Sequence, residues 1–331
     1  MRAFNACTRR AAVIALGLIA AGWLACHVAP AYAQSYPDRQ VRVIAGYPAG
    51  GGGDTLVRYY AAQLEKATGQ KFVVENKVGA NGKIATDAAL MAKPDGYTLL
   101  IHGTAAVVGN TFLMKDPGYD AMDLQPVATL AESVFVITVG PESKAATLKD
   151  LVDGLKAGGG KMKYGTATSV GLVASEKFLI ETGTKAERVN YKGTVDAARE
   201  MVSNQIDFLF ADATFAIAQA KQGRMKLLGV TTTARLSTAP DVPTMTEAGV
   251  PYIFTPKWAA WFPKGTPDAI VQKIAGLLRD TAKTEETKAF LTQSAATPLL
   301  TGSVAEATEV VKGDRDLWRK VTKEAKIEPQ G

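Results

Sequence analysis

The chain is 331 residues long, and 47% of its residues are hydrophobic while 21% are charged. Its 38 lysines and arginines outnumber its 32 aspartates and glutamates, which gives a formal net charge of +6 with histidine neutral. Nucleic-acid binding calls for basic residues clustered in a stripe, and the sequence contains no such cluster, so the mild excess does not indicate a nucleic-acid partner.

The first 33 residues have the pattern of a secretory signal peptide. Arginines in the first ten residues precede an apolar run from Ala11 to Ala25, and Ala31-Tyr32-Ala33 fits an A-x-A cleavage site. The run is interrupted by glycines and is too short for a membrane span. We therefore expect a soluble mature protein that begins near Gln34, exported by the Sec rather than the twin-arginine route, and released rather than lipidated at Cys26.

Cleavage at that site would change the inventory of reactive residues. Both cysteines, Cys7 and Cys26, would leave together with His27, so the mature chain would keep His102 as its single histidine. Three arginines and no acidic residue would also leave, which lowers the net charge from +6 to +3. Disulfides, thiol nucleophiles and Cys/His metal sites are thereby excluded, and we expect neither a metal nor a cofactor.

The first predicted strand and helix are joined by a glycine-rich loop. The strand covers Val41 to Ala45, the loop contains four consecutive glycines at 50 to 53, and the helix covers Thr55 to Thr68. Glycines tolerate positive φ and let the backbone approach a bound group closely. Asp54 is expected to cap the helix, whose free N–H groups would face the loop. We predict that this turn holds an anion.

The loop has two other possible interpretations. A P-loop ends in Gly-Lys-Ser/Thr, whereas this loop ends in Gly53-Asp54-Thr55, and a polyglycine run matches the dinucleotide-binding pattern only trivially. Nucleotide binding is therefore disfavoured. A flexible surface turn is the simpler alternative.

An alternation of strands and helices follows the loop. Predicted strands at Lys71 to Glu75 and Tyr97 to His102 flank a helix from about Lys83 to Ala92. Such alternation builds a parallel sheet with helices on both faces, and ligands then lie beyond the carboxyl ends of the strands. Those ends are the loops at residues 47–54, 79–82 and 103–105.

The same alternation starts again after a predicted strand at Val134 to Val139. Thr147-x-x-Asp150 opens a helix, and the strand Met162 to Gly165 then leads into Thr166 to Gly171 and a helix that reaches Gly183. Small and hydroxyl residues at that helix start expose backbone N–H groups, so this is a second candidate anion site. Further strands are predicted at Val189 to Tyr191, Ile206 to Ala211 and Lys226 to Thr231.

The last part of the chain is predicted to return to the first domain. A strand containing Trp258, Trp261 and Phe262 precedes a helix over Asp268 to Lys283, and a capping box at Ser303 starts a last helix. We therefore predict an α/β protein with two Rossmann-like α/β domains and a ligand cleft between them. The expected divisions are 1–33 for the signal peptide, 34–138 and 256–331 for domain I, and 139–255 for domain II.

Seven stretches together resemble one family, the extracytoplasmic solute receptors of tripartite tricarboxylate transporters, also called Bug receptors. They occur in the family's order and span nearly all of the mature chain. The stretches are Tyr36–Arg39, Tyr47–Gly51, Glu75–Ala80, Lys93–Leu99, Tyr191–Gly193, Ala239–Thr244 and Pro263–Pro267. Each one is unspecific by itself, and the specificity lies in the ordered set.

The resemblance implies a periplasmic binding protein of the type II-like architecture that closes on a small carboxylate. It would deliver this ligand to the membrane subunits of the transporter, and we expect a monomer without catalytic residues. In the family, backbone amides and small hydroxyls of two facing loops hold one carboxylate. The matching positions are Tyr47, Ala49, Gly50 and Gly51, with Asp54 ordering that loop, and Thr168, Ser169 and Val170 opposite; Thr104, Ala105 and Asp212 match positions near the rest of the ligand.

The second loop departs from the family pattern. It contains Val170-Gly171-Leu172, where the family commonly has glycines followed by a histidine. A polar ligand group buried against these apolar side chains would lack a partner, at a cost of about 1–3 kcal/mol. The departure favours a dicarboxylate with an apolar or aromatic middle over a hydroxylated acid such as citrate.

Two other functions remain as alternatives. A carboxylate-sensing receptor with a membrane signalling partner has the same sequence features as a transport receptor. A secreted hydrolase is disfavoured, because a catalytic triad could use only His102 and no G-x-S-x-G elbow surrounds a serine. His102, Trp258 and Trp261 are expected to serve in packing rather than in ligand contact.

Overall fold

A computed structural model describes residues 36–294, 296–298 and 302–330 of the chain. The predicted signal peptide, residues 1–33, lies outside these described residues. All helices and strands described below belong to Gln40–Gly331, one of the two compact units into which the chain divides. None of the helices in the described ranges is long and apolar enough to cross a bilayer.

The first sheet has six strands in the order β11-β4-β10-β3-β1-β2. β1 runs parallel to both β2 and β3, as the alternation of strands and helices predicts. β10 runs antiparallel to β3 and β4, and β11 runs antiparallel to β4. The strands are β1 (Val41–Ala45), β2 (Phe72–Asn76), β3 (Thr98–Gly103), β4 (Leu124–Ser133), β10 (Lys257–Pro263) and β11 (Ala296–Pro298).

The second sheet has five strands in the order β7-β6-β8-β5-β9. β6 is parallel to β7 and β8, whereas β5 is antiparallel to β8 and β9. The strands are β5 (Phe135–Val139), β6 (Lys163–Thr166), β7 (Glu187–Asn190), β8 (Phe208–Asp212) and β9 (Lys226–Val230).

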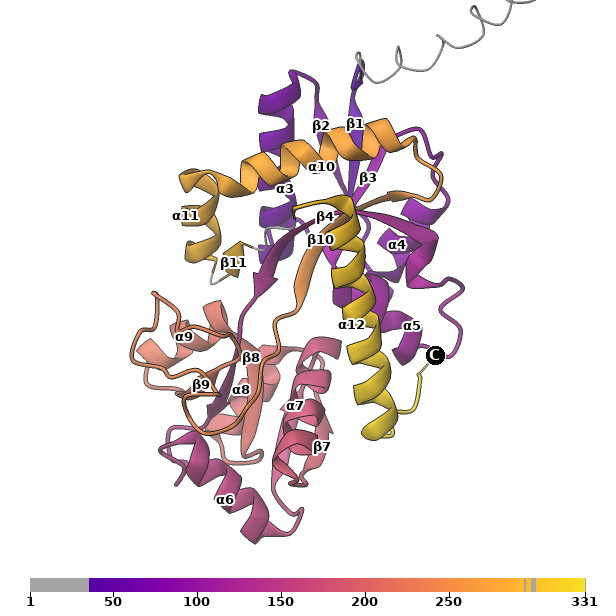
Figure 1. The fold of residues 1–331 in the computed structure, drawn as a ribbon. Coiled ribbons are helices and arrows are strands. Elements are labelled where there is room, and N and C mark those ends of the chain that lie inside the picture. The colour runs from indigo at the N-terminus through magenta and orange to yellow at the C-terminus, as the bar shows by residue number, and fades with distance from the viewer. Residues whose placement is uncertain (1–35, 295, 299–301, 331) are drawn as a thin grey trace, which may run out of the picture. The chain divides into compact units, whose positions relative to one another are not determined.

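The alternation of strands and helices predicts parallel strands, and both sheets contain antiparallel strands in addition. The exceptions arise where the chain passes between the two sheets. β4 leads out of the first sheet directly into β5, and β10 brings the chain back beside β4 (Figure 1). A strand that leaves and a strand that returns must run in opposite directions when they pair, so both sheets become mixed.

Helices with one apolar face surround the first sheet. In α3 (Gly52–Thr68), the buried residues Leu56, Val57, Tyr60 and Leu64 recur at helical spacing, and the helix ends at Gly69 with φ 72°. The other helices of this part are η1 (Ala80–Gly82), α4 (Lys83–Leu90), η2 (Ala105–Gly109), α5 (Asn110–Leu113), η3 (Ala121–Asp123), α10 (Asp268–Lys283), α11 (Glu285–Gln293) and α12 (Val304–Glu324).

The helices of the second sheet begin largely where local capping signals predict. Thr147 and Asp150 form the expected capping box at the start of α6, and Thr168 caps α7. The helices are α6 (Leu148–Gly158), α7 (Ser169–Thr182), α8 (Thr194–Val202) and α9 (Ala213–Lys221).

One cluster of buried hydrophobic residues includes side chains from both sheets. Leu100 and Trp261 contribute from the first sheet, and Tyr164 and Phe208 contribute from the second. The chain changes sheets between the end of β4 and the start of β5, which lies a few residues before the predicted boundary after residue 138. The division at 138/139 and 255/256 stays a prediction.

Candidate functional site

The glycine-rich loop between β1 and α3 is held by a buried carboxylate. α3 begins at Gly52 with Gly51 as its N-cap, so the prediction that Asp54 caps this helix is wrong. Asp54 instead lies in the first turn and is 1% exposed. The sequence placed the helix start too late because glycines 52 and 53, which are weak helix formers, take helical conformation here.

Asp54 bonds to three partners that surround it. Its Oδ2 accepts hydrogen bonds from the Gly50 N–H and from the Arg58 Nε, each at 2.8 Å, and its Oδ1 accepts from the Asn76 Nδ2 at 2.7 Å. The hydrogen bond from the Arg58 guanidinium lowers the pKa of Asp54 to about 2. The ionised carboxylate thus ties the loop to α3 and β2, which is the ordering role that the resemblance implied.

Tyr47 fixes the same loop to β3. Its hydroxyl accepts the N–H of Gly103 at 3.0 Å and lies 3.0 Å from His102 Nδ1. Burial raises the pKa of Tyr47 well above its usual range, so the hydroxyl stays protonated. The Tyr47 ring also contacts the rings of His102 and Trp258, with centroid separations of 4.4 Å and 5.0 Å. These three rings form an aromatic wall.

The loop after β6 has backbone N–H groups without an acceptor among the described residues, so we call it the open loop. The first loop, whose Gly50 N–H is bonded to Asp54, is the closed loop. Thr168 accepts the Gly171 N–H on its Oγ1 at 3.0 Å, and its backbone carbonyl accepts from Thr166 Oγ1 at 3.1 Å. α7 starts at Ser169, so the N–H groups of Ser169 and Val170 point out of its first turn, and neither has an acceptor among the described residues. Such groups at a helix start attract an anion.

A cavity of about 800 Å³ lies where the carboxyl ends of strands from both sheets converge. Of the residues predicted to contact a ligand, the ones that line this cavity are Tyr47, Ala105, Thr168, Ser169, Val170 and Asp212. The others, which lie outside the lining, are Ala49, Gly50, Gly51, Asp54 and Thr104.

Four of the predicted residues outside the lining, Gly50, Gly51, Asp54 and Thr104, have hydrogen-bond partners within the protein. The Gly50 N–H is bonded to Asp54, and the Gly51 N–H donates to the Pro48 carbonyl at 3.1 Å. Thr104 is buried and donates from Oγ1 to Asp314 Oδ2 at 2.5 Å. Within the lining, Asp212 caps α9 by accepting the Phe215 N–H at 2.9 Å.

Several lining residues were not predicted to contact a ligand, His102 and Trp258 among them. His102 is packed and hydrogen-bonded as expected, is 3% exposed, and nevertheless lines the cavity. Burial lowers the pKa of His102 to about 4, so the ring is neutral at pH 7. Its Nε2 has no partner in the described part of the chain. A positional signal could have revealed both residues. His102 lies at the carboxyl end of a strand, and Trp258 lies on the strand that pairs with it.

Glycines make room for the His102 ring. A Cβ atom at Gly46 would lie 2.1 Å from His102 Nε2, and one at Gly82 would lie 2.7 Å from the same atom. Both separations are impossible for real side chains, so the ring and the two glycines form one packed unit within the cavity wall.

The charged residues of the lining favour an anion. Lys257 pairs with Asp314 at 3.2 Å and donates to the Thr255 carbonyl at 2.9 Å. Lys192 is exposed and makes no hydrogen bond or ion pair with any residue that the structure describes. Asp212 is the acidic side chain in this lining. Groups of three or more His, Cys, Asp and Glu residues suited to a metal do not occur within residues 36–294, 296–298 and 302–330.

Known proteins resemble the chain over most of its length. The family model of the tripartite tricarboxylate transporter family receptors matches residues 56–326. A UPF0065 protein of Bordetella bronchiseptica is 32% identical over 315 residues, which covers 94% of this chain and 93% of that protein.

Solved structures resemble it in fold as well. R. palustris Rpa4515 with adipate has a TM-score of 0.77 and 28% identity, covering 89% of this chain and 99% of that one. The periplasmic binding protein BugD has a TM-score of 0.73 and 27% identity, covering 89% and 100%. With its two helix-flanked β-sheets and this extent of similarity, the chain belongs to the tripartite tricarboxylate transporter family receptors.

Proposed function

We propose that the protein is a periplasmic solute receptor that binds a small carboxylate in the 800 Å³ cavity and delivers it to the membrane subunits of a tripartite tricarboxylate transporter. One observation carries the proposal. Ser169 and Val170 line the cavity at the start of a 14-residue helix, and their N–H groups have no acceptor among the described residues. A carboxylate offers acceptor sites and no donors, so it satisfies both groups at once.

The first loop supplies the opposite side of the proposed site. Tyr47 lines the cavity, and its hydroxyl is engaged with Gly103. Contacts of Ala49, Gly50 and Gly51 with the ligand require that this part of the loop turn toward the cavity when ligand binds. These contacts remain a prediction.

The ligand class follows from the walls between the two loops. Val170, Phe135, Ala105 and Trp258 present apolar surface to the cavity. A dicarboxylate with an apolar or aromatic middle fits this surface without leaving a polar group unpaired. The R. palustris relative is described with adipate, a dicarboxylate of this kind, which supports the proposal.

The magnitudes are sufficient for useful affinity. Hydrogen bonds to a charged group contribute about 1.5–3 kcal/mol each. A micromolar dissociation constant corresponds to about −8 kcal/mol. Two or three such bonds together with the apolar wall reach this range after the cost of ordering the ligand.

We further propose that the protein binds without converting its ligand. His102, the histidine that a hydrolytic triad would need, is neutral, 3% exposed and engaged through Nδ1 with Tyr47. Incubation of purified protein with the bound acid, followed by chromatography, should return the acid unchanged. Appearance of a product would contradict this part of the proposal.

The binding test is a thermal-shift screen of the mature chain against dicarboxylates and aromatic acids. A ligand at 100 times its dissociation constant adds about 2.7 kcal/mol to the free energy of unfolding. Val170→Asp places a carboxylate beside the proposed anion site, and a 100-fold loss of affinity would leave about 0.4 kcal/mol at the same concentration. Val195→Asp, at a 60% exposed position outside the cavity lining, is the matched control.

Two results would count against the receptor. If no carboxylate stabilises the wild-type chain, or if Val170→Asp responds as fully as Val195→Asp, the ligand site is placed wrongly. Delivery is tested separately, by retention of the ligand-loaded protein on the purified membrane subunits, and absence of retention would contradict the transport role alone.

A further inference from the structure

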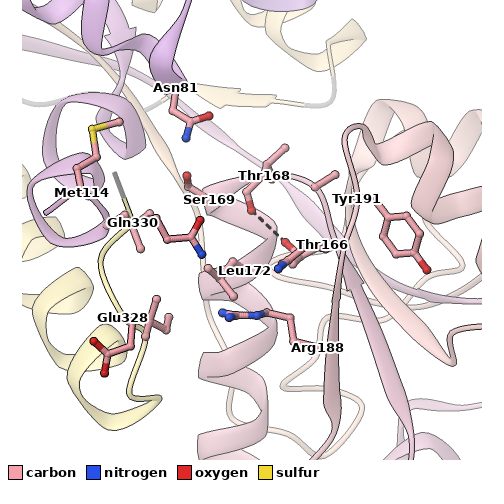
Figure 2. Close-up of a pocket in the computed structure, with 14 residues that line it drawn as sticks. Asn81, Met114, Thr166, Thr168, Ser169, Leu172, Arg188, Tyr191, Glu328 and Gln330 are labelled. Carbon is pink, nitrogen blue, oxygen red and sulfur yellow. Dashed lines mark hydrogen bonds between the residues drawn. The ribbon is translucent and has the colours of Figure 1, made fainter.

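A second cavity of about 400 Å³ adjoins the proposed ligand site, and we call it the side chamber. It shares Asn81, Ala167, Thr168 and Ser169 with the main cavity, so both open onto the start of α7. Figure 2 shows the side chamber with Ser169 and Thr168 at its upper edge and Arg188 at its lower edge. A ligand anchored at the start of α7 therefore has two directions in which to extend.

The segment after α12 forms one wall of the side chamber. The Gln330 N–H donates to the Leu113 carbonyl at 2.8 Å, and the Gln330 carbonyl accepts the Lys115 N–H at 3.2 Å. These bonds attach the segment to the end of α5. Gln330 also forms a parallel β-bridge with Met114, so this wall is fixed by backbone pairing. In Figure 2, Gln330 faces α7 across the chamber.

Arg188 is the positive charge of this chamber. It lies on the edge strand β7 and pairs with Tyr164 of β6. Two residues further along, Asn190 pairs with Thr166, which ends β6. At about 3.3 Å per residue, the Arg188 Cα is about 7 Å along the strand from that end. Its guanidinium extends past Leu172 toward the wall formed by the segment after α12 (Figure 2).

The Arg188 side chain makes no hydrogen bond or ion pair with any residue in the described ranges, and Glu328, which lies on the opposite wall, is likewise unpaired there. An arginine presents a planar fork of donors that binds a carboxylate through two parallel hydrogen bonds. The lining between Arg188 and the start of α7 includes Leu172, which offers an apolar surface to the middle of a ligand. The chamber therefore combines an available guanidinium with an apolar approach to it. Because Glu328 offsets the charge of Arg188, a carboxylate is held there by the donor fork of Arg188 and not by a net positive charge.

We propose that the side chamber takes the second carboxylate of an extended dicarboxylate, whose first carboxylate is held at the start of α7, and that Arg188 selects for it. This inference rests on the proposed function and adds the direction in which the ligand extends. It also assigns a preference: a straight dicarboxylate long enough to reach Arg188 binds more tightly than the monocarboxylate of equal length.

The competing position for the second carboxylate is Lys192. It lines the main cavity and, like Arg188, it is exposed and has no partner in the part of the chain that the structure describes. Arg188 is favoured because its chamber is bounded on a second side by the attached segment after α12, and because a guanidinium holds a carboxylate in one orientation whereas an ammonium acts as a point charge.

Titration calorimetry of the mature chain with adipate and with hexanoate tests this inference. Arg188→Gln should weaken adipate binding at least about tenfold and leave hexanoate binding unchanged, since only adipate has a second carboxylate. Arg188→Lys should give an intermediate loss for adipate. Arg224→Gln removes an arginine that is exposed and lines neither cavity, so it controls for net charge and should change neither affinity.

The outcomes separate this inference from the function on which it rests. If wild-type protein binds neither acid, the receptor proposal and this inference both fail. If both acids bind and Arg188→Gln leaves the adipate-to-hexanoate ratio unchanged, only the side chamber is excluded. A ratio that falls for Lys192→Gln and not for Arg188→Gln places the second carboxylate in the main cavity and overturns the inference. Unliganded thermal melts of each variant confirm that the chain is folded.

Discussion

The two strand-to-helix loops at the candidate site differ in how their backbone donors are used. In the first, the N–H groups of Gly50 and Gly51 are bonded to Asp54 and to the Pro48 carbonyl. In the second, Ser169 and Val170 line the cavity, and their N–H groups have no acceptor among the described residues. The loop with four consecutive glycines is thus the closed one, and the loop with fewer is the open one.

The difference separates two properties that a glycine-rich pattern combines. Glycine permits a tight backbone path, and Gly50 uses this freedom at φ 78°. Whether the amides of that path remain free for a ligand depends on the acceptors nearby. In the first loop, the buried Asp54 accepts the N–H of Gly50. In the second loop, Thr168 accepts the N–H of Gly171, and the N–H groups of Ser169 and Val170 have no acceptor among the described residues.

Removal of the Asp54 carboxylate should produce the largest effect, because it opens the closed loop. Asp54→Ala leaves the Gly50 N–H, the Asn76 amide and the Arg58 guanidinium without their acceptor, and we expect a loss of about 2–4 kcal/mol in the free energy of unfolding. Urea denaturation at pH 7 measures it. Asp316→Asn, an exposed partner of Arg319, should change stability by less than about 0.5 kcal/mol.

The same carboxylate predicts an acid dependence with a definite sign. The pKa of Asp54 is about 2 in the folded protein and near 4 in an unfolded chain, so its stabilisation is present above about pH 4 and is lost as the pH falls toward 2. The difference in stability between wild type and Asp54→Asn should therefore shrink between pH 5 and about pH 2. A constant difference over this range would show that Asp54 is not ionised through its bond to Arg58.

Next in size is the unit formed by His102 and its glycines, which packs against Tyr47 of the first loop. Gly46→Ala puts a Cβ 2.1 Å from His102 Nε2 and forces the ring away from Tyr47, which should cost about 1–3 kcal/mol. Gly52→Ala is the control, because a Cβ there meets nothing within 4 Å and lies in a helix, so it should be neutral or stabilise by up to about 1 kcal/mol. Equal stability of the two variants would refute this packing.

The smallest expected effect concerns the cap of the open loop. Thr168→Ala removes the acceptor of the Gly171 N–H and should cost about 1 kcal/mol, with a few-fold loss of carboxylate affinity because the start of α7 loosens. Thr284→Ala removes the corresponding cap of α11, far from the cavity lining, and should lower stability equally without changing affinity. Equal affinities of the two variants would show that the cap does not order the site.

Local signals predicted much of the fold. Strand β1 begins and ends where its apolar run does, α10 starts after Pro267, and α12 starts after Ser303. These features depend on residues within one or two turns of each other, through periodicity and capping. The π-helix η2 after β3 was not predicted, because it begins at Ala105 without a capping residue.

Sequence by itself determined the family, the two successive strand-and-helix alternations and the position of the second loop at the start of α7. Only the tertiary structure decided that the sheets are mixed, that Asp54 closes the first loop, and that Arg188 and the segment after α12 bound one chamber. The physical reason is range. Capping and periodicity act between residues close in the chain, whereas strand direction, buried hydrogen bonds and cavity walls depend on residues that are far apart in the sequence and meet only when the chain is folded.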